Sequence, residues 1–153
     1  MYSVYVEDRL IYNDASQLSG RYSLTAAKVD LELNRSGSFV FTLYPEHPCY
    51  GYIENRRMLI KVIREGEIFF FGQIIDVELG FYNQKTVTCE GELAFLLDTV
   101  QKPYDWLSGD SHTTVAALMR YFLYVHNKAL PEGDPKRFLP GNITVTDEND
   151  YIV

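Results

Sequence analysis

MLIKVIREGEIFFFGQII, residues 58–75, is the stretch that decides the fold. It consists of two runs rich in β-branched and aromatic residues, 58–64 and 68–75, separated by a short turn around Gly66. Two such runs joined by a glycine-containing loop predict a β-hairpin. The three consecutive phenylalanines favour a strand that is covered on both faces, and Gly72 after them indicates a bulge or bend. A strand that bends there predicts a sheet that curls into a β-barrel.

The residues before this stretch predict another hairpin. Val29, Leu31 and Leu33 alternate with acidic residues, which gives one buried and one solvent-facing side at the strand period of two. A turn at residues 34–37 contains a glycine and leads into the strand-like run 38–44. The sequence therefore predicts a second antiparallel strand pair.

The residues after it continue the same pattern. Val77 and Leu79 lead to a turn at 80–84, and residues 86–89 return as a strand. Sequential strands with short loops form an antiparallel sheet, and enough of them close on themselves. We expect an antiparallel β-barrel domain over residues 1–101.

The pattern changes near residue 100. Residues 91–98 predict a short helix, and Pro103 lies in a junction because proline lacks an amide donor and disfavours helix before it. Apolar residues at helical spacing predict an amphipathic helix over 115–125, with N-cap candidates at 110–113 and an end at 130–133. Strands followed by helices predict an α+β fold with a second domain over residues 102–153.

The C-terminal stretch has the residue pattern of a domain that is expected to continue. Residues 143–146 predict a further strand, and Tyr151-Ile152-Val153 is apolar, although domain ends are usually exposed and polar. We expect residues 102–153 to be the beginning of a longer domain.

Composition limits the function classes. The 153 residues are 46% hydrophobic and 14% aromatic, enough for one sizeable core. The net charge of −7 argues against a nucleic-acid-binding surface, because such surfaces use Lys and Arg to neutralise phosphates. No apolar run approaches the roughly 20 residues of a membrane-spanning helix, and residues 1–8 do not resemble a secretory signal. The two cysteines, Cys49 and Cys89, are expected to be reduced and packed.

The sequence offers few candidate catalytic or metal-binding residues. The imidazole bases are His47, His112 and His126, and a pairing of Cys49 with His126 has no support beyond both being present. The His47-Pro48-Cys49 triplet lacks the second pair of ligands that a closed zinc site needs. We expect no catalytic residue, no metal site and no cofactor.

One segment suggests contact with another protein. Residues 44–52 concentrate tyrosines and prolines between two predicted strands, and Tyr is favoured at protein interfaces. The candidate interface residues are Tyr44, Pro45, His47, Tyr50 and Tyr52. The alternative, that this loop packs its own tyrosines against the barrel, has equal weight.

Several stretches in order along the chain resemble the N-terminal region of phage and prophage tail proteins, the family of minor structural proteins, tail endopeptidases and tail-associated lysins. The most specific is CEGELAFL, residues 89–96. It belongs to a longer matching stretch, residues 87–98, and the others are residues 38–48, 68–73, 126–127, 136–138 and 141–145.

The resemblance implies a baseplate hub: an antiparallel β-barrel, then the start of an α/β domain, with three copies forming a ring at the end of the tail tube. Its partners would be itself as a homotrimer, distal tail or tail-tube proteins, and a C-terminal fibre or lytic part. The place implied is the tip or baseplate of the virion tail, after synthesis in the bacterial cytoplasm. DNA would pass through the ring without binding, and the family pattern assigns no catalytic residue to these positions.

Two other functions remain as alternatives. One is a carbohydrate-binding β module of a cell-wall-targeting protein, in which exposed tyrosines and Trp106 would stack on sugars. The other is a hydrolase that uses Cys49 or Glu90.

Overall fold

The computed structural model describes residues 1–14, 22–54, 57–100, 112–144 and 151–152. The chain divides into two compact units, Met1–Ala94 and Phe95–Val153. The domain boundary expected between residues 101 and 102 lies outside the described residues and stays a prediction.

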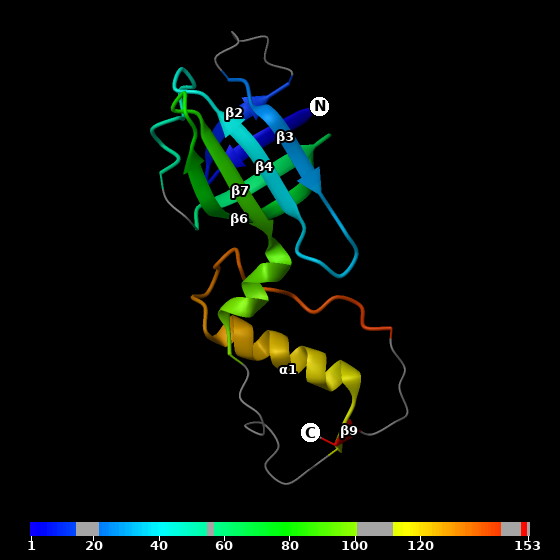
Figure 1. Cartoon of the computed structure of the whole chain (residues 1–153). Coiled ribbons are helices and arrows are strands. Elements are labelled where there is room, and N and C mark those ends of the chain that lie inside the picture. Colours follow the sequence, from blue (N-terminus) through cyan, green and yellow to red (C-terminus); the bar gives the residue numbers. More distant parts are fainter. Residues whose placement is uncertain (15–21, 55–56, 101–111, 145–150, 153) are drawn as a thin grey trace. The chain divides into compact units, whose positions relative to one another are not determined.

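The first unit is an antiparallel sheet of seven strands within the described residues (Figure 1). Its order, β2-β1-β5-β6-β7-β4-β3, places the β5–β6–β7 meander at the centre and two hairpins on its flanks. The strands are β1 (Tyr2–Val6), β2 (Arg9–Asn13), β3 (Thr25–Asp30), β4 (Ser38–Leu43), β5 (Leu59–Arg64), β6 (Glu67–Leu79) and β7 (Lys85–Gly91).

The sheet curls, so that β3, β4 and β7 lie in front of β1 and β2 in Figure 1. Its two ends are β2 and β3, and no hydrogen-bonded ladder joins them in the described part of the chain. The prediction of an antiparallel, β-rich fold is confirmed. Closure of the sheet into a complete barrel is not confirmed.

The stretch 58–75 forms the hairpin that its sequence predicts, with Arg64 paired to Glu67 and Leu59 to Gln73. The β6–β7 ladder begins where this pairing ends, at Gly72 opposite Gly91. β6 has irregularities at Phe69, opposite Val62 and Ile63, and between Ile74 and Asp76, and neither falls at Gly72 itself. A Cβ at Gly72 would lie 2.1 Å from the Glu90 carbonyl oxygen, so this glycine permits a close approach of two backbones.

The prediction of alternating burial through Leu33 is wrong. β3 ends at Asp30, and the side chains of Leu31 and Leu33 are exposed. A turn starts earlier than the hydrophobic alternation suggests, because the amide of Arg35 donates to Glu32 O and Asn34 adopts a positive φ of 62°. Turn geometry therefore overrides the strand pattern here.

The core of the first unit is apolar and draws on both flanks of the sheet. Fully buried side chains include Phe41 from β4, Ile60 from β5 and Val87 from β7. Phe39 stacks on Phe41 with ring centroids 5.0 Å apart. Alternating strand residues supply these side chains, as the period of two requires.

Among its described residues, the second unit contains a 3₁₀ helix, an α-helix and two very short strands. The elements are η1 (Glu92–Asp98), β8 (His112–Thr113), α1 (Val115–Lys128) and β9 (Tyr151–Ile152), with η1 beginning at the end of the first unit. The side chain of Thr114 caps α1 by accepting from the amide of Ala117. Both predicted helices are confirmed, although the cap is one residue beyond the predicted N-cap candidates.

The strand predicted at 143–146 is wrong where it can be checked. Ile143 and Thr144 lie in irregular backbone, while the other two positions are outside the described residues. A short β-branched run without a neighbouring strand gains no ladder hydrogen bonds, so its propensity alone does not hold it in a sheet. Among the helices described, none combines the length and apolar character needed to cross a membrane.

Candidate functional site

The tyrosine-rich loop between β4 and β5 is a chain of tight turns. Backbone hydrogen bonds run from His47 to Tyr44 O, from Tyr50 to His47 O and from Tyr52 to Cys49 O, with N···O distances of 2.9–3.0 Å. Three overlapping turns fix the loop backbone without a helix or a strand. The loop is therefore an ordered surface element, and each of its side chains has a defined direction.

His47 is buried and holds this loop to β2. Its Nε2–H donates to the Ile11 carbonyl oxygen at 2.9 Å, and its Nδ1 accepts from the amide of Cys49 at 3.0 Å. Burial lowers the pKa of the His47 imidazole from its ordinary value of 6.5, and the hydrogen bond to Ile11 opposes that shift. The neutral ring forms a hydrogen bond with each of these two groups, so the buried His47 stabilises the conformation of the loop.

Tyr50 and Tyr52 pack against the sheet unit, each beneath a cation. Lys85 Nζ lies 4.3 Å from the centre of the Tyr50 ring, and the Arg9 guanidinium lies 4.1 Å from that of Tyr52. The Tyr50 hydroxyl donates to Asn83 O in the β6–β7 turn. Of the five candidate interface residues, Tyr44 and Pro45 are the two with exposed side chains.

The two thiols are buried in the first unit. Burial raises the pKa of the Cys49 thiol, with Arg9 opposing, and burial alone raises the pKa of Cys89. Cys49 Sγ lies 3.8 Å from the Leu10 carbonyl oxygen. A nucleophilic cysteine needs a lowered pKa and access to substrate, and neither thiol has them.

The β6–β7 turn carries an exposed apolar cluster that the sequence reasoning missed. Leu79, Phe81 and Tyr82, here called the hairpin tip, are 68%, 92% and 75% exposed. The rings of Phe81 and Tyr82 meet edge to face with centroids 5.2 Å apart. The available signal was two adjacent aromatic residues in a turn, where Gly, Asn and Asp are the usual residues.

Three hydrogen bonds hold the turn beneath the hairpin tip. The amide of Gly80 donates to Gln84 O at 2.8 Å, that of Asn83 to Gly80 O at 3.0 Å, and that of Tyr82 to the Gln84 side-chain oxygen at 2.9 Å. The Tyr50 hydroxyl adds a fourth contact from the tyrosine-rich loop. The tip is therefore preorganised, and its rings need little further ordering to make a contact.

A hollow of about 440 Å³ lies between the two ends of the curled sheet. Its lining is mostly apolar and comes from six strands and the residue before β3. Lining side chains include Tyr2, Tyr12, Leu24, Ala27, Val29 and Phe69. Both end strands contribute to it, with Tyr12 from β2 and Ala27 and Val29 from β3.

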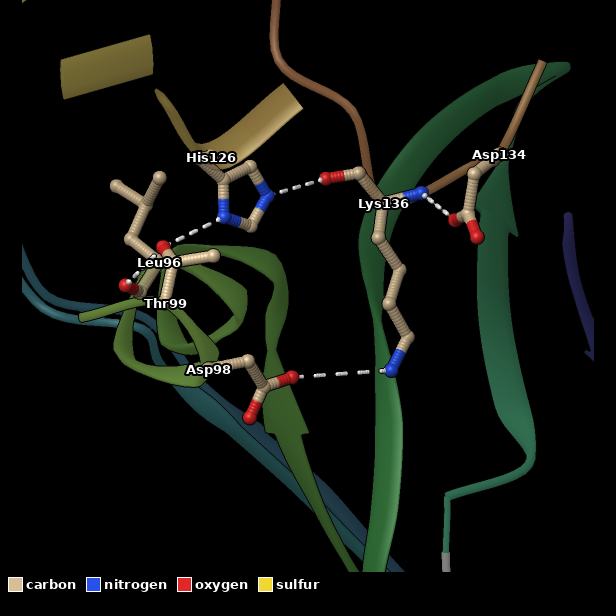
Figure 2. A network of polar contacts seen from close by, with 6 residues as sticks. All are labelled: Leu96, Asp98, Thr99, His126, Asp134 and Lys136. Atoms are coloured by element: carbon tan, nitrogen blue, oxygen red, sulfur yellow. Dashed lines mark hydrogen bonds and ion pairs between the residues drawn. The ribbon is translucent and has the colours of Figure 1, made fainter. Parts of the chain in front are cut away.

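The second unit contains a polar network around His126, which is fully buried (Figure 2). Its Nδ1 lies 3.1 Å from the Thr99 hydroxyl and its Nε2 lies 3.0 Å from the Lys136 carbonyl oxygen. The amide of Lys136 donates to Asp134, and the Lys136 ammonium lies 4.0 Å from the Asp98 carboxylate. The network joins the end of η1, the end of α1 and the 134–138 loop.

The neighbouring residue completes this connection. The Asn127 side chain donates to Phe138 O at 2.6 Å and accepts from the Phe138 amide at 2.9 Å. The Phe138 ring lies edge-on to His126, with centroids 5.4 Å apart. These polar groups bond to backbone and to one another, an arrangement suited to holding segments in place.

Cys49 and Glu90, the residues of the hydrolase alternative, both belong to the first unit. Glu90 accepts a hydrogen bond from Ser36 Oγ at 3.3 Å. Trp106 lies outside the described residues. Within the residues that the structure describes, no group of three or more His, Cys, Asp or Glu side chains could hold a metal ion.

No known family model matches this chain, and neither does any curated protein. Among solved structures, the chain is similar to the 43 kDa tail protein of prophage MuSo2 from Shewanella oneidensis, with a TM-score of 0.55 and 16% sequence identity. The match covers 82% of this chain but only 38% of that protein. At this identity the likeness shows a shared fold.

Proposed function

We propose that this protein is a structural component of a phage or prophage tail. The observation that carries the proposal is the likeness in fold to a prophage tail protein over 82% of this chain. The motif resemblance over residues 38–48 and 87–98 is independent support, because it rests on sequence and not on strand arrangement. A role as architecture suits an ordered sheet whose buried polar side chains serve its own loops.

The more specific proposal is a baseplate hub. Three copies form a ring at the tail tip, which joins the tail tube to a C-terminal fibre or lytic part. The motif resemblance supports this arrangement. A curled sheet with two strand ends and exposed apolar side chains offers surfaces for contact with other subunits.

In this proposal the segment carries out no catalysis and lets DNA pass. The net charge of −7 supports the second point, because an acidic surface repels phosphates and keeps DNA affinity low. The buried thiols and the local hydrogen bonds of His47 and His126 support the proposal that the segment carries out no catalysis.

Electron microscopy of tail particles tests the proposal directly. Particles induced from the strain that encodes the protein are labelled with gold-conjugated antibody against residues 1–153. We expect label at one end of the tail, and deletion of the gene should remove complete tails. Label spread along the tail tube would overturn the hub but keep the tail assignment. If tails of the original strain carry no label and the deletion strain still assembles normal tails, both the hub and the tail assignment are overturned.

Binding to DNA tests the passage role. The purified chain should show no shift of a short duplex at roughly 0.1 M salt, where the Debye length is about 10 Å. Tight binding that weakens steeply with added salt would contradict a ring through which DNA slides.

A carbohydrate-binding module is the second candidate, and the exposed rings of Phe81 and Tyr82 favour it. Aromatic side chains on a rigid turn can stack on sugar faces. Titration with cell-wall glycan fragments separates the candidates, because a hub segment should give no saturable signal. Saturable binding that is lost in Phe81→Ser would support the module.

A further inference from the structure

The hairpin tip is a surface feature that the sheet unit itself does not use. Single exposed apolar side chains are normal on protein surfaces, but contiguous ones mark sites of interaction. Leu79, Phe81 and Tyr82 are contiguous, and the turn that carries them is fixed by hydrogen bonds. Nothing in the internal packing of the unit requires two exposed rings at this turn.

The hollow of the same unit has the size and character to receive such rings. Its volume is about 440 Å³. A dry cavity of about 150 Å³ holds one benzene molecule, so this hollow can accept one or two aromatic side chains. Tyr2, Tyr12 and Phe69 in its lining offer ring edges and faces for contact.

The hairpin tip does not fill the hollow of its own molecule. Phe69 lines the hollow and Leu79 begins the tip, and both lie on the single strand β6 (Glu67–Leu79). Nine residues, 70–78, separate them, which at about 3.3 Å per residue is up to roughly 33 Å along a fully extended strand. The rings of Phe81 and Tyr82 are 92% and 75% exposed and do not line the hollow, so a contact between the tip and a hollow needs a second molecule.

We propose that the hairpin tip of one copy of this chain inserts Phe81 and Tyr82 into the hollow of a second copy. The contact is head to tail, because each copy contributes its tip to one neighbour and its hollow to the other. Head-to-tail contacts give rings when the rotation closes. The inference deepens the proposed hub and rests on it for its place in the tail.

Charge near the two surfaces agrees with this pairing. The guanidinium of Arg64 lies 5.9 Å from the centre of the Tyr2 ring and 5.7 Å from that of Phe69, at the edge of the hollow. Glu78 is exposed and precedes Leu79 at the base of the tip. Glu65 and Glu67 lie beside Arg64, so a seated tip would gain a local contact between Glu78 and the Arg64 guanidinium and no general electrostatic attraction.

The contact is small, so it should be weak in solution. An aromatic side chain buries about 150–250 Å² in an interface, whereas a stable one buries roughly 1,200–2,000 Å² in total. Two rings, one leucine and the matching hollow fall short of that range. We expect association of the full chain only between about 10 μM and 1 mM, and tighter assembly only when other tail proteins hold the ring.

The test uses variants that each disable one side of the contact. Phe81→Ser/Tyr82→Ser removes the rings but keeps the hollow. Ala27→Trp fills the hollow from the exposed side of β3 but keeps the tip. Sedimentation velocity of the unaltered chain should show a weight-average mass that rises with concentration, and each variant alone should remain monomeric. An equal mixture of the two variants should form a one-to-one dimer and stop there.

Matched controls separate this contact from unrelated stickiness. Leu33 is 91% exposed on another turn of the same unit, and Leu33→Ser should associate as the unaltered chain does. Ala27→Glu repeats the block by placing a carboxylate in the hollow, in case tryptophan disturbs the strand. Circular dichroism should give every variant the unaltered spectrum.

Three outcomes would overturn the inference: a chain that is monomeric up to about 1 mM, an assembly that both blocked variants still form, or a mixture that does not pair. In the second case the proposed hub survives with a different interface. A failure of the proposed function appears separately, as the absence of the protein from tail particles.

Discussion

The interior of each of the two units is stabilised by a different kind of interaction. The sheet unit has an apolar core that includes Phe41, Ile60 and Val87, and its buried His47 serves only one surface loop. In the second unit, the fully buried side chains among the described residues are Phe95 and the polar His126. Contacts of His126 and Asn127 join its segments. Apolar packing dominates the first unit, and specific hydrogen bonds carry more of the second.

The largest effect should come from the core of the sheet. Phe41→Ala removes a fully buried ring that stacks on Phe39, and we expect a loss of about 3–5 kcal/mol in the free energy of unfolding. Urea denaturation followed by circular dichroism measures it. Phe81→Ala removes the same side chain from a site that is 92% exposed, and it should change stability by less than about 0.5 kcal/mol. Equal losses would show that burial is not what distinguishes these two positions.

A slightly smaller effect should come from close backbone packing in the same unit. A Cβ at Gly91 would lie 1.8 Å from the Ser36 carbonyl oxygen, so Gly91→Ala must displace backbone and should cost about 3 kcal/mol. Gly51 has no atom within 4 Å of its Cβ position, which makes Gly51→Ala the control. Thermal denaturation should show a lower Tm for Gly91→Ala and an unchanged Tm for Gly51→Ala.

The comparison predicts a local loss in the second unit. His126→Ala removes two hydrogen bonds and leaves the Lys136 carbonyl oxygen without its imidazole partner, at a cost of about 2 kcal/mol. Hydrogen exchange should speed up at the end of α1 and in residues 134–138, while amides of the sheet keep their protection. Arg120→Ala on the exposed surface of α1 is the control. Uniform loss of protection across both units would contradict the division drawn here.

The smallest effect should be a pH dependence in the sheet unit. The pKa of His47 is lowered in the folded protein, so the unfolded chain binds its proton more readily. The contribution to stability is therefore complete above about pH 6.5 and decreases as the pH falls below it. His47→Asn keeps an acceptor for the Cys49 amide and should flatten this part of the curve. Denaturation midpoints of the unaltered chain and of His47→Asn, measured between about pH 7.5 and pH 5, give the difference. This range includes the ordinary His pKa of about 6.5.

Local patterns predicted the local structure well. The 58–75 hairpin, the turn at 80–84 and both helices follow from alternation, glycine placement and helical spacing. The prediction of a strand through Leu31 and Leu33 was wrong because the hydrophobic alternation continues into residues that form a turn. The order of the strands could not be predicted, since pairing of β1 with β5 and β4 with β7 joins residues far apart in sequence.

The candidate site was predicted less completely. The tyrosine-rich loop was recognised from its composition, but composition does not say which tyrosines turn inward. The cations above Tyr50 and Tyr52 come from Lys85 and Arg9, at distant positions in the chain. The hairpin tip and the hollow were missed, because exposure and a gap between strand ends depend on the folded sheet.

The strand order also sets a schedule for folding during synthesis. The β1–β2 hairpin is made first, but the partner of β1 is β5, more than 50 residues later in the chain, and β4 waits for β7. The β5–β6–β7 meander can pair as it emerges, and it then provides the edges on which both earlier hairpins dock. β1 can gain its partner once residue 64 has left the ribosome, but β4 keeps an unpaired edge until residue 91 has done so. A nascent chain stalled before that point should therefore be a substrate for chaperones, and one stalled well beyond it should resist protease.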